Sequence, residues 1–377
     1  MTHQQTLTRL KDWNQSEAFR NFILSLDSKE SRRSYIGGFT TFMRYCNVKT
    51  HDEMLTALMP VKRLEGIIRD FMIYLKEERH SSPATVRTYT NCIAHFYKMN
   101  DVIINWDKLK KFKGRYHGVV DDVPYRRDQI KTLIDNCPAR DKAMILLMSS
   151  AGLRRGALPM LRLKDLTRIT KYDLYKITVY KKEQEQYISY CTPECAKAID
   201  QYLEWRARVG EQLTPDSILF RSEFDKSRLI KIAKPRPIQA QSITRLVIDL
   251  LDLTGIRPQT HGQGQYFKTN LMTCHGFRKF FHTECINHNM NPIYAEYLMG
   301  HKTGLVKSYF KPSDQDLLEG TDQSRGYKAI IPYLTINATE EENQRLKQEL
   351  AKKEKESKEW ELCRAQINQI RQKMGLL

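Results

Sequence analysis

The chain has 377 residues and a formal net charge of +18 at pH 7. This length exceeds what one hydrophobic core normally supports, so we expect two domains and an appendage. No run approaches the roughly 18 apolar residues that cross a bilayer, and residues 1–14 lack the pattern of a secretion signal, so no membrane association is expected. So large a cationic excess favours a polyanion through counterion release, and nucleic acid is the leading partner class.

The eight cysteines show neither a CxxC pair nor the spacing of a zinc finger. This pattern argues against a disulfide scaffold and against a zinc module. Cys274, His275 and Cys285 are close in sequence, but no fourth ligand accompanies them. We therefore expect reduced, buried thiols, no metal and no cofactor. The expected location is the cytoplasm, in association with the nucleoid.

Residues 1–115 are predicted to form a helical domain, because apolar residues recur at spacings of three and four without a competing strand pattern. Apolar stripes run through residues 35–46, 64–75 and 86–96. The basic segment Lys108–Arg115 follows, and then residues 116–122, which contain Gly and Asp. Such a composition is typical of an interdomain linker.

Residues 116–336 are predicted to form a second domain, mostly helical with a small sheet. Helical spacing recurs after Asp128 and over residues 193–208, 241–253, 276–288 and 292–299. Leu174, Ile177 and Val179 alternate with other residues and lead through a charged turn to Tyr187–Tyr190, which predicts a β-hairpin. The expected fold class is therefore mostly α with a small β-sheet (α+β).

Residues 337–377 form the third predicted part. From Glu340 to Met374 the chain lacks Pro and Gly and is dense in Glu and Lys. Apolar residues recur at multiples of seven, at Leu346, Trp360, Ile367 and Met374. This period is typical of a coiled coil. Polar residues between Leu350 and Trp360 interrupt the seam, so a single helix docked elsewhere fits the pattern as well.

Several short segments of the second domain supply cationic or hydrogen-bonding side chains in a fixed order. They are Gly152-Leu-Arg154, the basic hairpin turn at 180–185, His275-Gly-Phe-Arg278, Leu298-Met-Gly-His301 and Lys307-Ser-Tyr309. The i, i+3 spacing of His275 and Arg278 places both on one helical face. Each segment is common by itself. Their order along a strongly basic chain is the specific signal.

This ordered set resembles the signature of the tyrosine recombinase (integrase) family over residues 108–312, and residues 1–115 look like the family's core-binding domain. The resemblance implies a tyrosine recombinase catalytic domain with the catalytic residues Arg154, Lys182, His275, Arg278, His301 and the nucleophile Tyr309. Lys182 matches the lysine that ends the family's hairpin strand, and Lys181 is the adjacent alternative. Residues 300–309 and 331–335 look most like archaeal integrases.

Two positions depart from the family's pattern. The family usually carries an acidic residue three positions after the first arginine, and here that position is Ala157. The support normally given to the active-site base is therefore missing or supplied from elsewhere. The step from His301 to Tyr309 is one residue shorter than the family's commonest spacing. Neither departure removes a catalytic group.

The chemistry explains why these residue types belong together. A phosphodiester under attack gains negative charge, which Arg154 and Arg278 can hold without a metal. Free tyrosine has a pKa near ~10, so forming its phenolate at neutral pH costs roughly 4 kcal/mol that nearby cations must offset. The resemblance assigns His275 as base, His301 as hydrogen-bond donor to phosphate and Lys182 as acid for the leaving 5′ oxygen.

The resemblance implies site-specific DNA recombination, by integration or excision, through a covalent 3′-phosphotyrosyl intermediate. The implied partners are double-stranded DNA attachment sites and further copies of the chain, assembled as a tetrameric synapse. A type IB topoisomerase-like nicking and closing enzyme is the first alternative. A DNA-binding protein without catalysis is the second, which Ala157 favours and the intact set of catalytic residues opposes. Whether Tyr309 acts in its own active site or a neighbour's stays open.

Overall fold

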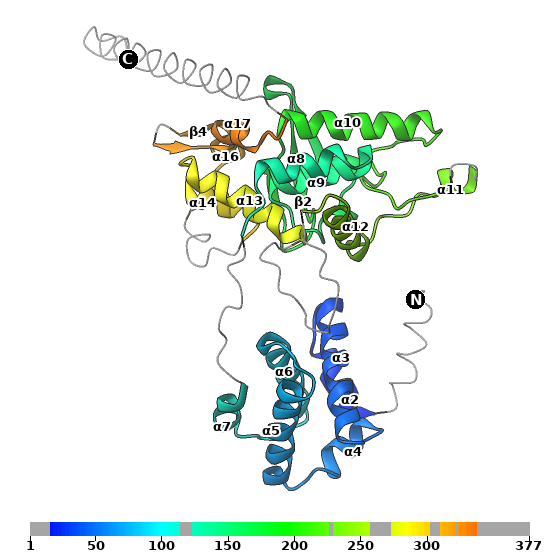
Figure 1. The fold of residues 1–377 in the computed structure, drawn as a ribbon, viewed down its shortest axis with the longest axis vertical. Helices are drawn as coiled ribbons and strands as arrows, with labels where there is room; N and C mark the ends of the chain where they lie inside the picture. The colour runs from blue at the N-terminus through cyan, green and yellow to red at the C-terminus, as the bar shows by residue number, and fades with distance from the viewer. Residues whose placement is uncertain are drawn as a thin grey trace, which may run out of the picture. The chain divides into compact units, whose positions relative to one another are not determined.

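In the computed structural model of the protein, the described residues are 16–113, 123–225, 229–256, 273–301, 310–321 and 323–337. The chain divides into two compact units, Met1–Val119 and Val120–Leu377, which we call the N-terminal and C-terminal units. Figure 1 shows their elements. The predicted domain boundary between residues 115 and 116 lies outside the described residues, as does the predicted charged tail from residue 340 onward.

The described part of the N-terminal unit is helical. Its elements are α2 Glu17–Leu24, α3 Lys29–Tyr45, α4 His51–Thr56, α5 Val61–Glu77, α6 Pro83–Met99, α7 Trp106–Lys110 and the 3-10 turn η1 Lys111–Lys113. Side-chain caps fix where several helices begin, as at Ser82, whose hydroxyl accepts a hydrogen bond from Thr85 N at 3.2 Å. The predicted apolar stripes form the core, in which Phe39, Phe71 and Phe96 are fully buried. The helical prediction for this region is confirmed.

The C-terminal unit is also mostly helical and contains two small sheets. Its helices are α8 Arg127–Asp135, α9 Ala139–Ala151, α10 Pro193–Arg208, α11 Leu229–Ala233, α12 Ala240–Leu253, α13 Thr273–Asn287, α14 Pro292–Leu298, α16 Asp314–Glu319 and α17 Ile331–Leu334. Short 3-10 turns are η2 Leu158–Met160, η3 Leu163–Asp165, η4 Thr170–Tyr172 and η5 Tyr327–Ile330. The predicted α+β class, mostly helical, is confirmed.

The larger sheet has three antiparallel strands, β1 Leu166–Ile169, β2 Leu174–Val179 and β3 Tyr187–Tyr190. The register that pairs Val179 with Tyr187 confirms the predicted hairpin and leaves its charged turn between them. The sequence pattern did not predict β1, a four-residue edge strand whose side chains are only partly buried. A second sheet pairs β4 Gly320–Thr321 with β5 Ser324–Arg325.

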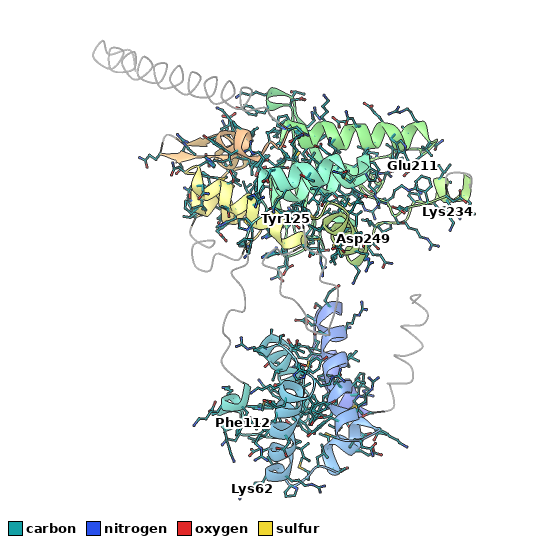
Figure 2. The ribbon with its side chains drawn as sticks, in the orientation of Figure 1. Lys62, Phe112, Tyr125, Glu211, Lys234 and Asp249 are labelled. Atoms are coloured by element: carbon teal, nitrogen blue, oxygen red, sulfur yellow. The ribbon has the colours of Figure 1, made fainter. Side chains whose placement is uncertain are left out.

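Helix α9 is the centre of the C-terminal unit, with α8, α10 and α13 packed against it. Its residues from Ala143 to Ala151 are all buried, as expected for a helix that is apolar on every face. Further along the chain, Tyr327 packs into the same core and donates a hydrogen bond to Ser150 O at 2.9 Å. Tyr125, labelled in Figure 2, stacks on Phe277 of α13 with ring centroids 4.3 Å apart.

A buried ionic cluster ties the end of α10 to the chain that follows it. Arg206 and Arg221 both donate to the carboxylate of Glu211, Arg206 through Nε at 3.0 Å and Arg221 through Nη1 at 2.5 Å. Figure 2 shows Glu211 near the C-terminal end of α10. Burial alone would raise the pKa of Glu211, but the hydrogen bonds from Arg206 and Arg221 outweigh it and lower that pKa. The carboxylate therefore stays ionised between its two partners.

Glu194, in the first turn of α10, holds the last described residues of the chain. Its carboxylate accepts hydrogen bonds from Ile336 N at 2.7 Å, Asn337 N at 3.1 Å and Asn337 Nδ2 at 2.7 Å. Lys131 of α8 donates to Asn337 Oδ1 at 2.9 Å. A carboxylate at a helix N-terminus also interacts favourably with the helix dipole. The backbone is therefore fixed as far as Asn337.

Two expectations from the composition concern the cysteines and membrane-spanning helices. The cysteines of the described residues are free thiols, and five are buried: Cys92, Cys191, Cys195, Cys274 and Cys285. The expected burial therefore holds for these five thiols, whereas Cys46 and Cys137 are partly exposed. Among the described residues, no helix has both the length and the apolar character needed to cross a membrane.

Candidate active site

Arg278 joins two helix ends that are far apart in sequence. It lies on α13, is 2% exposed, and donates through Nη1 to Gly152 O, at the end of α9. Through Nη2 it donates to Met299 O, at the end of α14, at 2.6 Å. The segments that contain Arg154 and His301 follow directly on these two helix ends. Arg278 thus brings together three of the motifs that the sequence analysis singled out.

Both helix ends require glycine. Gly152 and Gly300 adopt the left-handed conformation, with φ of 60° and 62°, which L side chains rarely adopt. A Cβ at Gly152 would lie 2.5 Å from Phe281 Cδ1, and one at Gly300 would lie 2.4 Å from Tyr187 Cδ1. The aromatic rings occupy the space that any side chain would need. Close packing at these turns fixes the backbone that leads into Arg154 and into His301.

Arg154 lies beside Arg278 and completes a pair of guanidinium groups. Arg154 is exposed and donates through Nη1 to Gly300 O at 3.4 Å. Burial first, and then the positive charge of Arg154, lower the pKa of Arg278 to about 10. Two cations held this close repel one another, and an anion between them would relieve that repulsion. The arrangement is suited to binding a phosphate group.

His275 lies at the start of α13, one turn before Arg278, and is exposed. The buried neighbours Cys274 and Phe277 face the core, so the helix presents the imidazole on its outer side. His275 and Arg278, three residues apart in sequence, therefore both lie on a helix. Among the described residues, no cluster of three or more His, Cys, Asp or Glu side chains is arranged to hold a metal ion.

His301 is held by a residue that the sequence analysis did not single out. Its Nδ1 lies 2.5 Å from Oε2 of Glu296, on α14, and its backbone N donates to Glu296 O at 3.0 Å. The other carboxylate oxygen, Oε1, lies 3.1 Å from Nε2 of His282 on α13. The positive charge of Arg278 also interacts with Glu296.

The two lysines of the hairpin turn differ in their contacts. Lys181 Nζ lies 3.9 Å from Asp165 Oδ1 and donates to Lys164 O at 3.4 Å. Lys182 adopts a left-handed conformation with φ of 70°, and its backbone N donates to Gln186 Oε1 at 2.8 Å. Within the described residues, no hydrogen bond or ion pair engages the Lys182 ammonium. Lys182 is therefore the less restrained of the two amines.

Two tyrosines of the hairpin lie near the arginine pair and were not predicted there. The rings of Tyr180 and Tyr187 are 6.1 Å apart at the base of the turn. Burial raises the pKa of Tyr180, against the opposing positive charges of Arg154 and Arg278. Burial likewise raises the pKa of Tyr187 to about 12, against the charge of Arg278. Both hydroxyls are therefore kept protonated, which suits neither to act as a nucleophile.

The predicted nucleophile, Tyr309, lies outside the described residues. The next residue, Phe310, is described: its carbonyl accepts a hydrogen bond from the Tyr297 hydroxyl, and its ring stacks on Tyr294 at 6.4 Å. Tyr294 is 2% exposed, and Tyr327 is buried with its hydroxyl bonded to Ser150 O. These alternatives to Tyr309 are occupied in packing or in hydrogen bonds.

Known structures share this fold. The XerH site-specific recombinase bound to palindromic difH substrate aligns with a TM-score of 0.52 at 15% identity, over 74% of each chain. A lambda integrase tetramer bound to a Holliday junction aligns with a TM-score of 0.50 at 13% identity, over 80% of this chain and 77% of that one. At such low identities these alignments show the fold alone. It is the fold of tyrosine recombinases.

The sequence pattern of the phage integrase family matches residues 125–315, which is half of the chain and includes every predicted catalytic residue. The protein belongs to the phage integrase family. Transposase A from transposon Tn554 of Staphylococcus aureus is 26% identical over 225 residues, 54% of this chain and 55% of that protein. The chain thus spans about half the length of the curated relatives it matches. These staphylococcal relatives give no support to the archaeal likeness.

Proposed function

We propose that the protein is a site-specific recombinase that cleaves and rejoins DNA strands through a covalent 3′-phosphotyrosyl intermediate on Tyr309. The observation that carries the proposal is the pair formed by Arg154 and Arg278. Both guanidinium groups lie at one point, where the ends of α9 and α14 meet, and no carboxylate forms an ion pair with either among the described residues. A phosphodiester gains negative charge on attack, and such a pair stabilises it without a metal.

Each remaining residue has a role that follows from its chemistry and position. His275, exposed one turn before Arg278, accepts the proton of the attacking tyrosine. His301 donates a hydrogen bond to a phosphate oxygen, and Lys182 protonates the leaving 5′ oxygen. In this step the tyrosine oxygen bonds to phosphorus, and the bond between phosphorus and the 5′ oxygen breaks. His275 receives the tyrosine proton, and the leaving 5′ oxygen receives a proton from Lys182. Rejoining reverses these steps and needs no ATP.

The proposed partners are double-stranded DNA attachment sites and further copies of the chain. The net charge of +18 supports binding to a polyanion. The solved relatives include a recombinase bound to its difH substrate and a tetramer bound to a Holliday junction, which supports assembly as a tetramer on DNA. We assign DNA clamping to residues 1–115, catalysis to 116–336 and assembly to 337–377. A DNA substrate of this kind supports a cytoplasmic location in association with the nucleoid.

A direct test begins with the DNA. The full-length protein is used to select its binding site from a randomised duplex library, and that site is built into a nicked suicide duplex in which cleavage releases a short end fragment. We expect a protein–DNA adduct that resists denaturant and forms equally in EDTA. Loss of cleavage in EDTA with binding retained would contradict the arginine-based mechanism. Absence of any adduct would leave only the DNA-binding alternative.

Partner exchange separates recombination from topoisomerase-like nicking and closing. Two duplexes of different length, each labelled and each carrying the selected site, are incubated with the protein. We expect strands that join one duplex to the other. Relaxation of a supercoiled plasmid carrying the site, without any joined product, would instead favour the type IB topoisomerase-like activity.

Replacement of the hairpin lysines gives a matched pair of variants. Lys182→Ala should slow cleavage roughly 100-fold or more, because it removes the acid for the leaving oxygen. Lys181→Ala should have a small effect, since that amine is engaged by Asp165 and Lys164 O. A 5′-bridging phosphorothiolate, whose leaving group needs little protonation, should restore cleavage to Lys182→Ala. Restoration of Lys181→Ala instead would move the assignment by one residue.

A further inference from the structure

One carboxylate lies between two imidazoles beside the arginine pair. Oε2 of Glu296 is 2.5 Å from His301 Nδ1, and Oε1 is 3.1 Å from His282 Nε2. A carboxylate can only accept hydrogen bonds, so each of these ring nitrogens must carry a proton. Glu296 therefore fixes which nitrogen of His301 is protonated. It leaves Nε2 as the nitrogen that faces away from the carboxylate.

The backbone holds this arrangement as firmly as the side chains do. His301 N donates to Glu296 O at 3.0 Å, and Arg278 Nη2 donates to Met299 O at 2.6 Å. These two hydrogen bonds fix the backbone of the turn between α14 and His301. Gly300 in this turn is packed against the Tyr187 ring. The His301 ring, 36% exposed, thus has a fixed backbone and one fixed nitrogen.

The third position after Arg154, which usually carries an acidic residue in the family, is Ala157, and it is 1% exposed. No carboxylate can enter the site from there. Glu296 comes from a different element, α14, and contacts His301 instead. With Nδ1 held by the carboxylate, the His301 ring is oriented with Nε2 on its opposite side, where a protonated Nε2 would donate to a phosphate oxygen.

We propose that Glu296 is a positioning residue: it orients His301 and fixes its Nδ1 proton, while His282 holds the second carboxylate oxygen. The effect on cleavage rests on the proposed recombinase function. The positioning itself does not, because it requires no DNA. The two parts are therefore tested separately.

The positioning is tested in the full-length protein without DNA. Nitrogen-15 labelled histidine reports the protonation of each ring nitrogen by NMR, and His301→Gln and His282→Gln identify the two signals. In the wild type, we expect a protonated Nδ1 on His301. Glu296→Ala removes the acceptor at Nδ1, so the ring proton of His301 should distribute between Nδ1 and Nε2. An unchanged His301 signal in Glu296→Ala would overturn the proposal.

The catalytic consequence is tested by single-turnover cleavage of the nicked duplex. Glu296→Ala should slow cleavage roughly tenfold to 100-fold with unchanged DNA affinity. In a His301→Ala background, the same substitution should have no further effect, because Glu296 acts only through His301. A wild-type rate in Glu296→Ala, or equal slowing in both backgrounds, would contradict the proposal. Should Glu296→Ala unfold, Glu296→Met replaces it, since methionine has a similar length but offers no oxygen to accept from Nδ1.

Glu284 provides a matched control on α13. Its Oε2 lies 3.4 Å from His288 Nδ1, which is closer to Glu284 O at 2.9 Å, so it is a weaker contact to a histidine that has no assigned role. Glu284→Gln should leave both the His301 signal and the cleavage rate unchanged. If the wild type forms no adduct on any selected duplex, the proposed recombinase function fails, and the NMR measurement still decides the positioning.

Discussion

Tyr309→Phe is expected to bind DNA with unchanged affinity and to form no covalent adduct, a loss of at least about 10,000-fold in cleavage. The substitution removes one oxygen and leaves the ring to pack, so binding and folding should persist. Adduct formation on the nicked duplex and binding in a gel-shift assay measure the two properties. Mass spectrometry of the trapped, nuclease-trimmed wild-type adduct should find the nucleotide on the peptide that contains Tyr309.

Tyr180→Phe is the matched control for this experiment. Its hydroxyl lies near the charges of Arg154 and Arg278, yet burial keeps it protonated. The variant should still form the adduct. An adduct that survives in Tyr309→Phe, or a nucleotide found on Tyr180, Tyr327 or Tyr333, would overturn the assignment of the nucleophile and the register of the site.

Glu211→Gln is expected to lower the free energy of unfolding of the C-terminal unit by about 3–5 kcal/mol. The substitution leaves the side chains of Arg206 and Arg221, 0% and 2% exposed, without the carboxylate that both contact. Two buried cations would then face an amide that carries no charge. Urea unfolding followed by tryptophan fluorescence measures the change, since Trp205 lies on α10 beside the cluster.

An ion pair whose carboxylate is exposed serves as the control for Glu211 in the same unit. Glu223 contacts Arg140 Nη2 at 3.1 Å, but its side chain is 86% exposed. Water screens such a pair, so Glu223→Gln should change the free energy of unfolding by less than about 1 kcal/mol. Equal destabilisation by Glu211→Gln and Glu223→Gln would show that burial of the cluster has no special effect.

Local patterns in the sequence sufficed to predict most of the helices and part of the site. Residues 193–208 begin with a proline and carry a helical apolar period, and α10 has those bounds. His275 and Arg278 could be placed on one helical face because spacing alone determines it. Gly152 and Gly300 could be predicted to end helices because left-handed caps favour glycine.

Contacts between distant elements could not be predicted in this way. Glu296 and His282 meet because α13 and α14 pack side by side, and nothing in either segment marks the pair. Tyr180 and Tyr187 lie near Arg278 only because the hairpin folds against the ends of α9 and α14. Strand β1 is four residues long with partly buried side chains, so it has too few alternations to stand out from a loop.

The hydrogen bonds that Glu194 accepts from Ile336 and Asn337 have a practical consequence for dissecting the protein. A truncation designed to remove residues 340–377 should end after Asn337, so that the carboxylate keeps all of its donors. A truncation two residues earlier, after Thr335, would leave a charged group at the start of α10 without them. A loss of assembly in the shorter protein could then result either from the missing tail or from disruption of the C-terminal unit.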